Sequence, residues 1–380
     1  MVNVFTLCRK QILQRTLVLG ALLLASTVVV MSGHLTQFGA PTQNAVPPAS
    51  TSAEISSATG NTYYVSLTGN DRYDGSFARP WRTIQHAANV VTPGSMVLIA
   101  PGTYLETIES ARSGTPGNPI RYVSANKWAA VIDANGQYTA WHNTGNYIEI
   151  RDFQITNSQC LGINDEGSYV LILGNNVHHI PAKKSICRDN GGSGIVNSNY
   201  AGSEDKVIGN VVHDIGTPSA PDQSVHGIYH SNTGGLIANN IAFRNAGWGI
   251  HLWHSANAVI VANNTVFNNG SGGILIGNDR TLNDHTLVSR NIVAYNGGFG
   301  ISENTATGTH NRYVENLTFR NTKGNIHLQN ENQQEQTIYE APQFANYTGD
   351  GNGDYHLVPN AGPNQRGLGA YVPLLDTSEQ

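Results

Sequence analysis

Two short segments of this 380-residue chain, 226–230 and 249–254, hold its densest group of histidine and aromatic side chains. Imidazole and phenol groups transfer protons in enzymes, and the faces of Trp and Tyr rings stack on the apolar faces of sugar rings. We therefore expect a site for a sugar polymer here. The catalytic candidates are His251, Tyr229, His226 and His230, and the candidate stacking surface is Trp253.

Charged side chains close to these segments are further candidates, because a cation must stabilise the charge that develops on an acidic sugar. The candidates for proton transfer and for binding the sugar are Lys184, Lys183, Arg188 and Glu166. The candidate calcium ligands, whose oxygen atoms are of the type that calcium prefers, are Asp189, Asp205 and Asp214. Structural alternatives stay open, because the lysines and the arginine can be solvated loop charges and no calcium motif of fixed spacing is present.

The elements that must position these residues form a repeat between residues 152 and 329. Its first part is a hydrophobic strand, which follows the column Asp152, Asn176, Asn210, Asn240, Asn264, Asn291 and Asn316. Steps of 24 to 34 residues indicate a solenoid, and alternation of apolar residues indicates strands. A second column, whose amides can satisfy the backbone of tight turns, is Asn157, Asn245, Asn269, Asn296 and Asn321.

The second part of the repeat is a strand that opens on Gly-Ile. Its isoleucines are Ile163, Ile195, Ile228, Ile250, Ile274, Ile301 and, after Asn instead of Gly, Ile326. If these residues stack inside, the next residue of each strand faces outward, which places Tyr229, His251 and Trp253 on one outer face. Since about 25 residues accommodate three short strands, we predict an all-β fold, a right-handed parallel β-helix. The Leu frame of a leucine-rich repeat is missing, and a propeller needs about 40 residues per blade.

The strand pattern also offers a structural interpretation for four histidines, including two of the catalytic candidates. His179 and His213 fall in a column otherwise occupied by Ile155 and several Phe residues, so we interpret them as stacked core residues. His226 and His230 can point inward by strand parity, which makes a structural role as reasonable as a functional one.

Two consecutive coils interrupt the repeat at the same corner. From Asn240 onward the next Gly-Ile, or Asn-Ile, begins nine residues after the Asn, but from Asn176 and Asn210 it begins 18 and 17 residues later. The additional residues form the segments 181–190 and 215–224. Because long loops on a rigid scaffold often carry function, we expect both loops to form a wall beside Tyr229, His251 and Trp253.

Composition excludes some classes of function. Only 12% of the residues are charged and the formal net charge is −5, without a basic stripe, so nucleic acid is not an expected partner. Residues 1–33 contain basic residues followed by an apolar run, which indicates a signal peptide or a signal anchor. We expect a secreted monomer in which 34–60 is a disordered linker, 61–375 is the β-helix domain and any membrane contact is made by the N-terminal segment.

The three cysteines indicate one disulfide. Cys8 lies in the targeting segment, which leaves Cys160 and Cys187 as the pair in the exported domain. An oxidising compartment favours their bond, which would tie the first long loop to the neighbouring coil. Two buried free thiols are the alternative.

Both ends of the domain resemble a known family. The opening segments 63–66, 69–75, 80–88 and 102–104, and the tail 341–344, 353–357 and 369–371, are similar to secreted bacterial right-handed β-helix proteins of the pectate-lyase-like superfamily. The resemblance implies a short N-terminal capping helix at 83–91, core repeats at about 146–330 and a closing coil at about 338–373. It does not imply one reaction, since the opening is shared by lyases, epimerases, hydrolases and binding proteins.

We expect a polysaccharide lyase that acts on an acidic polymer of the pectate or alginate type by β-elimination. This reaction needs a base, an acid and a neutralising cation, which can be calcium. The alternatives are a carbon-5 epimerase, a glycoside hydrolase and a non-catalytic glycan-binding surface protein.

Overall fold

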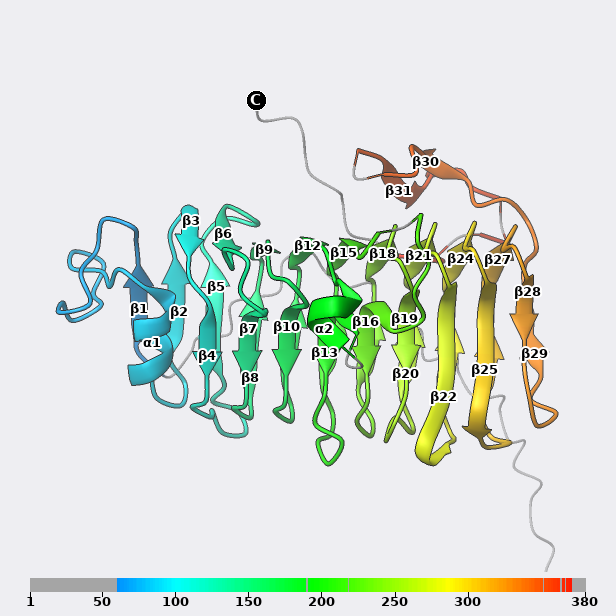
Figure 1. The fold of residues 1–380 in the computed structure, drawn as a ribbon, viewed down its shortest axis with the longest axis horizontal. Coiled ribbons are helices and arrows are strands. Elements are labelled where there is room, and N and C mark those ends of the chain that lie inside the picture. Colours follow the sequence, from blue (N-terminus) through cyan, green and yellow to red (C-terminus); the bar gives the residue numbers. More distant parts are fainter. Residues whose placement is uncertain are drawn as a thin grey trace, which may run out of the picture. The chain divides into compact units, whose positions relative to one another are not determined.

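The computed structural model describes residues 60–188, 191–217, 219–350, 352–362, 364–365 and 367–370, which all lie in one compact unit. The expected signal segment and most of the expected linker lie outside these residues. The described part of the chain contains no helix that is long and apolar enough to cross a membrane. Its strands run parallel in three stacked sheets, as Figure 1 shows, so the predicted all-β parallel β-helix is confirmed.

From β2 to β28, each coil contributes one strand to each sheet, in the order sheet 1, sheet 2, sheet 3. Sheet 1 has eleven strands: β1 (Thr62–Val65), β2 (Met96–Ile99), β5 (Ile120–Ser124), β8 (Ile148–Arg151), β11 (Leu171–Leu173), β14 (Lys206–Ile208), β17 (Leu236–Ala238), β20 (Ile260–Ala262), β23 (Leu287–Ser289), β26 (Arg312–Val314) and β29 (Gln334–Glu335). The coils therefore start well before residue 146, where we expected the core repeats to begin.

Sheet 2 contains the strands that follow the Asn corner: β3 (Gly102–Leu105), β6 (Ala130–Asp133), β9 (Gln154–Thr156), β12 (Asn176–Ile180), β15 (Val211–Ile215), β18 (Ile241–Phe243), β21 (Thr265–Phe267), β24 (Ile292–Ala294) and β27 (Leu317–Phe319). Sheet 3 contains the Gly-Ile strands: β4 (Ile108–Ser110), β7 (Thr139–Asn143), β10 (Leu161–Asp165), β13 (Gly192–Asn197), β16 (Val225–His230), β19 (Trp248–Leu252), β22 (Gly272–Asn283), β25 (Phe299–Thr307) and β28 (Gly324–His327).

A ladder of buried Asn amides forms the corner between sheets 1 and 2. The backbone N and the Nδ2 of Asn240 both donate to Oδ1 of Asn264, at 3.0 Å each. The same pair of bonds links the whole series Asn175, Asn210, Asn240, Asn264, Asn291 and Asn316. Every coil thus satisfies buried polar groups of its neighbour, which fixes the stacking register.

Two residues of the predicted first Asn column, Asn176 and Asp152, each lie one residue away from the position that takes part in the observed ladder. The ladder contains Asn175, and Asn176 instead pairs with Val211 as the first residue of β12. Asp152 lies one position before the ladder, with a φ of 62°, and the backbone N of Phe153 donates to Asn175 Oδ1 at 3.0 Å. A short polar residue tolerates this left-handed position, which explains why Asp152 looked like a ladder member.

The second corner, between sheets 2 and 3, has its own ladder of Asn245, Asn269, Asn296 and Asn321, as predicted. Asn157 does not belong to it. This residue is exposed, has a φ of 60° and donates from Nδ2 to Asp133 Oδ1 at 2.7 Å. The position that aligns with Asn245 is Ser158.

In four of the Gly-Ile strands, those that contain Gly227, Gly249, Gly273 and Gly300, the glycine makes room for this second ladder. A Cβ at Gly227 or Gly249 would lie 2.7 Å from the Nδ2 of Asn245 or Asn269, respectively. Contacts this short are not tolerated, so both positions need glycine. The next residue is the stacked isoleucine, and Ile163, Ile195, Ile228, Ile250, Ile274 and Ile301 are all fully buried, as predicted.

The two ends of the stack differ. Helix α1 (Ile84–Val90), with Thr83 as its N-cap, buries Ile84, Ala87 and Ala88 against the core, which confirms the capping helix. The expected closing coil is wrong, because β30 (Phe344–Asn346) and β31 (Asp354–Leu357) form an antiparallel hairpin. The hairpin lies beside sheet 2 (Figure 1), where Tyr355 packs on Phe267 with ring centroids 4.3 Å apart.

This hairpin packing also corrects the interpretation of two histidines. His178, not His179, pairs with His213, and their rings stack 5.0 Å apart. The column continues through Phe243 and lies on the outer face of sheet 2, while the inner face carries residues such as Val212. His179 is exposed at the corner.

Candidate functional site on the outer face of sheet 3

The outward positions of sheet 3 form one continuous column. Backbone pairing aligns Glu109, His142, Asn164, Val196, Tyr229, His251, Leu275, Ser302 and His327. The predicted outward direction of Tyr229 and His251 agrees with this register. His142 and His251 are four strands apart, about 19 Å at the usual strand spacing. The same face therefore presents two separate groups of polar side chains.

The first group, which we call the aromatic cluster, consists of His226, Tyr229, Trp248, His251 and Trp253. His251 lies at its centre, with ring centroids 4.7 Å from His226, 5.1 Å from Tyr229 and 5.2 Å from Trp253. His251 is only 8% exposed, and neither ring nitrogen has a hydrogen-bond partner among the described residues. Burial holds the pKa of His251 well below its ordinary value, so its imidazole is neutral.

Two glycines of the next coil accommodate the tryptophans of this cluster. A Cβ on Gly277 would lie 2.3 Å from the Trp253 ring, and one on Gly272 would lie 2.2 Å from the Trp248 ring. Both indoles thus lie directly over backbone of β22. Glycine at these two positions is what leaves room for the two indole rings beside His251.

The other predicted catalytic histidines have different environments. His226 belongs to the cluster, since its ring lies 4.6 Å from Tyr229, and burial lowers its pKa to about 3. His230 points into the coil, where Nδ1 meets Asn197 Oδ1 at 3.2 Å and Nε2 meets the Gly234 carbonyl at 3.0 Å. His230 therefore helps to fill the interior and does not reach the cluster.

His254 of the predicted segment 249–254 borders the cluster, together with Tyr200, Asp279 and Arg280, which the sequence did not single out. Tyr200 packs on His254 at 4.4 Å, and the Arg280 guanidinium lies 4.3 Å above the Tyr200 ring. His254 Nδ1 lies 2.7 Å from Asp279 Oδ1. Asp279 and Arg280 belong to β22, which extends beyond the usual strand length. Counting outward positions further along that strand would have found Asp279.

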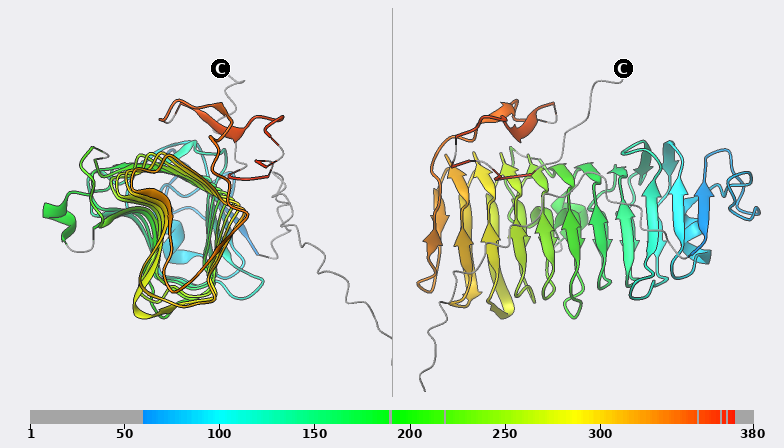
Figure 2. Two further views of the ribbon diagram at one scale, coloured as in Figure 1. Left: turned by 90° about the vertical axis from the view of Figure 1, so that its right-hand side faces the viewer. Right: turned by 180° about the vertical axis from the view of Figure 1, so that it is seen from behind.

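The two long loops run from the end of sheet 2 to the start of sheet 3. The disulfide between Cys160 and Cys187 is present, with a Cα–Cα distance of 5.5 Å, and it ties α2 (Lys184–Cys187) to the neighbouring coil. Figure 2 shows α2 projecting from the outline of the coil. The backbone N of Gly192 donates to the Ser224 carbonyl at 3.2 Å, so the loops meet where β13 and β16 begin.

The predicted basic residues of the first loop are exposed. Lys183 is the N-cap of α2, and Lys184 and Arg188 also face solvent. A hydrogen bond from the Ser224 side chain and the nearby charge of Lys184 help to lower the pKa of Asp222. Lys184 therefore lies near Asp222, on the His226 side of the cluster.

The second group on sheet 3 is an imidazole between two carboxylates. His142 Nδ1 lies 2.8 Å from Glu109 Oε2, and His142 Nε2 lies 3.2 Å from Glu166 Oε1. Glu166 was a predicted substrate-binding residue, whereas Glu109 and His142 were missed. Their strands, β4 and β7, lack the Gly-Ile pair that marked the other strands.

The two candidate calcium ligands that the structure describes, Asp205 and Asp214, do not come together. Asp205 is buried inside the coil, where the Asn232 Nδ2 donates to its carboxylate, and burial together with the nearby Asp165 raises its pKa. Asp214 lies at the corner between sheets 2 and 3, bonded to Arg244 Nε at 2.8 Å. Asp189 falls outside the described residues. These residues do not fit a single calcium cage beside the aromatic cluster.

Comparison with known proteins identifies relatives of this architecture. The chain is 37% identical over 83 residues to the uncharacterized protein YwoF of Bacillus subtilis (strain 168), covering 21% of this chain and 18% of that protein. It is 27% identical over 257 residues to pectate lyase L of Dickeya dadantii (strain 3937), covering 59% of this chain and 60% of that protein. The chain thus spans less than two thirds of both curated relatives.

Solved structures show the same fold. The crystal structure of pectate lyase Pel9A matches with a TM-score of 0.57 and 19% identity, over 80% of this chain and 90% of that one. A rhamnogalacturonan lyase matches with a TM-score of 0.53 and 17% identity, over 75% and 91%. A family model described as the Pel9A-like right-handed β-helix region matches residues 63–347. The chain therefore belongs to the Pel9A-like right-handed β-helix family.

Proposed function

We propose that this protein is a carbohydrate-active enzyme that cleaves an acidic polysaccharide by β-elimination at the aromatic cluster. The observation that carries the proposal is the neutral imidazole of His251, whose two ring nitrogens have no partner within the described structure. Membership of a family that is described by a pectate lyase, and similarity to pectate lyase L, support this substrate class.

The proposed reaction removes the proton from carbon 5 of a uronate and breaks the bond between carbon 4 and the glycosidic oxygen. The His251 imidazole accepts the carbon-5 proton, and the electron pair of that C–H bond forms the new double bond between carbons 4 and 5. The C–O bond electrons leave with the glycosidic oxygen, which takes a proton from the Tyr229 hydroxyl. Trp253 stacks on a sugar ring and keeps it beside His251.

The environment of each group suits its role. A lowered pKa keeps His251 unprotonated, so it is ready to accept a proton at neutral pH, although it is an intrinsically weak base. Burial raises the pKa of Tyr229 far above its ordinary value, so its hydroxyl keeps the proton that the leaving oxygen needs. Arg280 is exposed next to Tyr200. Its guanidinium group is of the type that binds carboxylates, so Arg280 is the candidate for binding the carboxylate of the sugar.

Calcium was the other candidate for neutralising the carboxylate. Since the candidate aspartates do not gather beside His251, we assign this role to Arg280 and route no step through calcium. An assay with added calcium, and another with a chelator, tests that assignment. Loss of activity with the chelator, and retention in Arg280→Gln, would transfer the neutralising role to a metal.

We propose an extracellular location for this activity. The support is the basic and apolar N-terminal segment 1–33 and the disulfide between Cys160 and Cys187, which an oxidising compartment favours. Fractionation of cells that express the full chain, followed by activity assays of the medium and the membranes, tests this location. Activity confined to the cytosol would contradict it.

Glycoside hydrolysis at the other end of sheet 3 is the second candidate. Glu109 and Glu166 each contact one nitrogen of His142, so their carboxylates lie within about 8 Å of each other, in the range of paired glycosidase carboxylates. The two reactions leave different products. Elimination gives a sugar end with a double bond that absorbs ultraviolet light, whereas hydrolysis gives a new reducing end without it.

The test of the proposed function is product analysis with polygalacturonate, alginate and a neutral glucan. Ultraviolet-absorbing ends from an acidic polymer are the expected result. Reducing ends without this absorbance would favour the second candidate. A polymer that is only inverted at carbon 5 would indicate an epimerase, and retention on a polysaccharide gel without any product would leave glycan binding; both results would overturn the proposal.

A further inference from the structure

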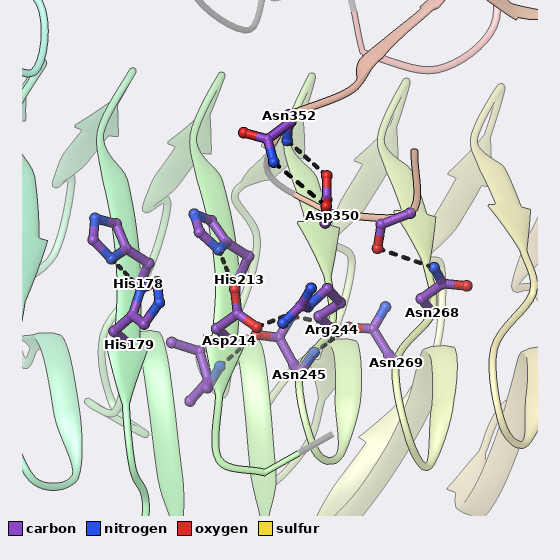
Figure 3. Close-up of polar contacts among 12 residues, drawn as sticks. His178, His179, His213, Asp214, Arg244, Asn245, Asn268, Asn269, Asp350 and Asn352 are labelled. Atoms are coloured by element: carbon purple, nitrogen blue, oxygen red, sulfur yellow. Dashed lines mark hydrogen bonds and ion pairs between the residues drawn. The ribbon is translucent and has the colours of Figure 1, made fainter. Parts of the chain in front are cut away.

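Four side chains with metal-binding chemistry gather outside the proposed active site, at the end of sheet 2. They are His178 and His179 of β12 and His213 and Asp214 of β15, and Figure 3 shows them on neighbouring coils. His179 directly precedes Ile180 and the first long loop, and Asp214 directly precedes Ile215 and the second. The group therefore stands where both loops leave the coil.

Three of these residues converge closely enough for one ion. One ligand atom from each of His179, His213 and Asp214 lies within 4.8 Å of the other two. Ligand atoms bound tetrahedrally to one zinc ion at about 2.0–2.2 Å are about 3.4 Å apart, so the side chains must draw together by up to about 1.4 Å when the ion binds. Both β12 and β15 pair in register through His178 and His213, which holds the two coils together at this point.

Neighbouring side chains orient the three ligands. His178 Nδ1 lies 2.6 Å from His179 Nδ1, and a proton on the His179 atom leaves His179 Nε2 free to bind a metal. Arg244, which is not a proposed ligand, donates from Nε to Asp214 Oδ1 at 2.8 Å. The hydrogen bond of 2.7 Å between Asp214 Oδ2 and His213 Nδ1 joins two of the proposed ligands and holds them next to each other. Metal sites are commonly supported by such a second layer of hydrogen bonds.

We propose that His179, His213 and Asp214 form a binding site for a transition-metal ion such as Zn²⁺ or Co²⁺. Two imidazoles with one carboxylate suit these ions, whereas calcium prefers oxygen ligands alone. The three protein ligands leave coordination positions for water. Because the ligands come from two coils, the ion links the bases of the two loops that border the aromatic cluster.

A second group of the same residue types provides an internal comparison. His285 and His310 stack 4.8 Å apart, and His310 Nδ1 lies 2.8 Å from Asp284 Oδ2. The side chains of these two histidines are 66% and 64% exposed, compared with 11% for His213. Substituting them removes the competing group with little effect on packing, since exposed side chains contribute little to the core.

The experiment uses the untagged full chain with His285→Asn, which suits the φ of 55° at that residue, and His310→Ala, titrated with Co²⁺ alone and followed by visible absorbance. We expect one bound Co²⁺ per chain, displaced by Zn²⁺ and not by Ca²⁺. Adding His179→Asn is expected to weaken Co²⁺ binding about tenfold or more. Asparagine is chosen because residue 179 has a φ of 54°, which asparagine tolerates.

The proposal is independent of polysaccharide cleavage, so the proposed function can fail without affecting it. Circular dichroism and the melting temperature establish that the His179→Asn chain is folded. If the background protein binds no Co²⁺, or if folded His179→Asn binds Co²⁺ as tightly as its background, the proposed site is wrong. Asp214→Asn, which keeps the side-chain shape, is the second variant and should weaken binding in the same direction.

Discussion

His142 and His251, two of the three histidines of the sheet 3 column, occupy equivalent positions in different surroundings. His142 Nδ1 is hydrogen bonded to Glu109 Oε2 at 2.8 Å, while His142 Nε2 lies 3.2 Å from Glu166 Oε1 without a hydrogen bond among the described residues. Both nitrogens of His251 are buried among rings and have no partner among the residues that the structure describes. The repeat thus supplies one geometry for every coil, and the neighbours of each outward residue decide its chemistry.

This difference separates the two candidate reactions along the same face. An unpartnered neutral imidazole next to a phenol suits proton abstraction followed by protonation of a leaving group. An imidazole between two exposed carboxylates suits a glycoside hydrolase site, in which the two carboxyl groups carry out the reaction. Substitutions that affect one end and spare the other therefore test the assignment.

The largest expected effect is that of His251→Gln. Removing the base should lower kcat by at least about 100-fold, within the usual range for a general base. Rates of formation of unsaturated ends measure this effect, and His142→Gln, in the same column, is the matched control that should stay near the wild-type rate. A His251→Gln enzyme with full activity would remove the aromatic cluster from the mechanism.

Tyr229→Phe should have the next largest effect, about tenfold to 100-fold on kcat, because the leaving oxygen loses its proton donor. The ring remains, so KM should change little. An increase of KM at unchanged kcat would mean that Tyr229 binds the sugar and does not protonate it.

Gly277→Ala tests the stacking surface. A Cβ at this position would lie 2.3 Å from the Trp253 ring, so the indole must move away from its place beside His251. We expect KM to rise about fivefold to tenfold, consistent with loss of about 1 kcal/mol of ring stacking. Gly362→Ala is the control, because a Cβ there meets no atom within 4 Å.

The pH dependence of stability should reflect the buried carboxyl of Asp205. Its pKa is raised in the folded state, so the folded protein holds a proton that the unfolded chain releases above about pH 4. This contribution to stability is complete at low pH and is lost as the pH rises through the raised pKa. Histidines with lowered pKa values, such as His226 and His230, act in the opposite direction, but only below about pH 6.5.

Melting temperatures between about pH 6.5 and 8.5 isolate the carboxyl, because the histidines are then neutral in both states. Wild-type protein should become less stable across this range, and Asp205→Asn should show a flatter profile. Equal slopes for the two proteins would mean that Asp205 does not hold the proton.

The sequence predicted the parts of the fold that depend on a strict pattern. In the Gly-Ile column the glycine leaves room for the Asn side chain at the corner, and the isoleucine fills the core. The column therefore showed which residues of each strand point inward and which point outward. This alternation placed Tyr229 and His251 on the outer face. The first Asn column failed at Asn175 and Asn176, where two adjacent asparagines fit the spacing equally well. Only hydrogen bonds to the neighbouring coil distinguish them.

The candidate site was predictable only in part for a related reason. Glu109 and His142 lie on strands without the Gly-Ile signal, so nothing in the repeat pointed to them. Arg280 reaches the cluster because β22 continues to Asn283, and the length of a strand beyond its repeat is set by pairing with β25. Such contacts between coils are absent from any local sequence pattern.

The most direct test of the central claim is product formation by the Glu109→Gln/Glu166→Gln double variant on the acidic polymer that the wild-type protein cleaves. Both substitutions keep the side-chain size and remove only the carboxylates beside His142. The expected result is formation of unsaturated ends within about threefold of the wild-type rate, since interactions at exposed charges are weak. Loss of product formation in the folded double variant would contradict the assignment and place the chemistry at the His142 end of sheet 3.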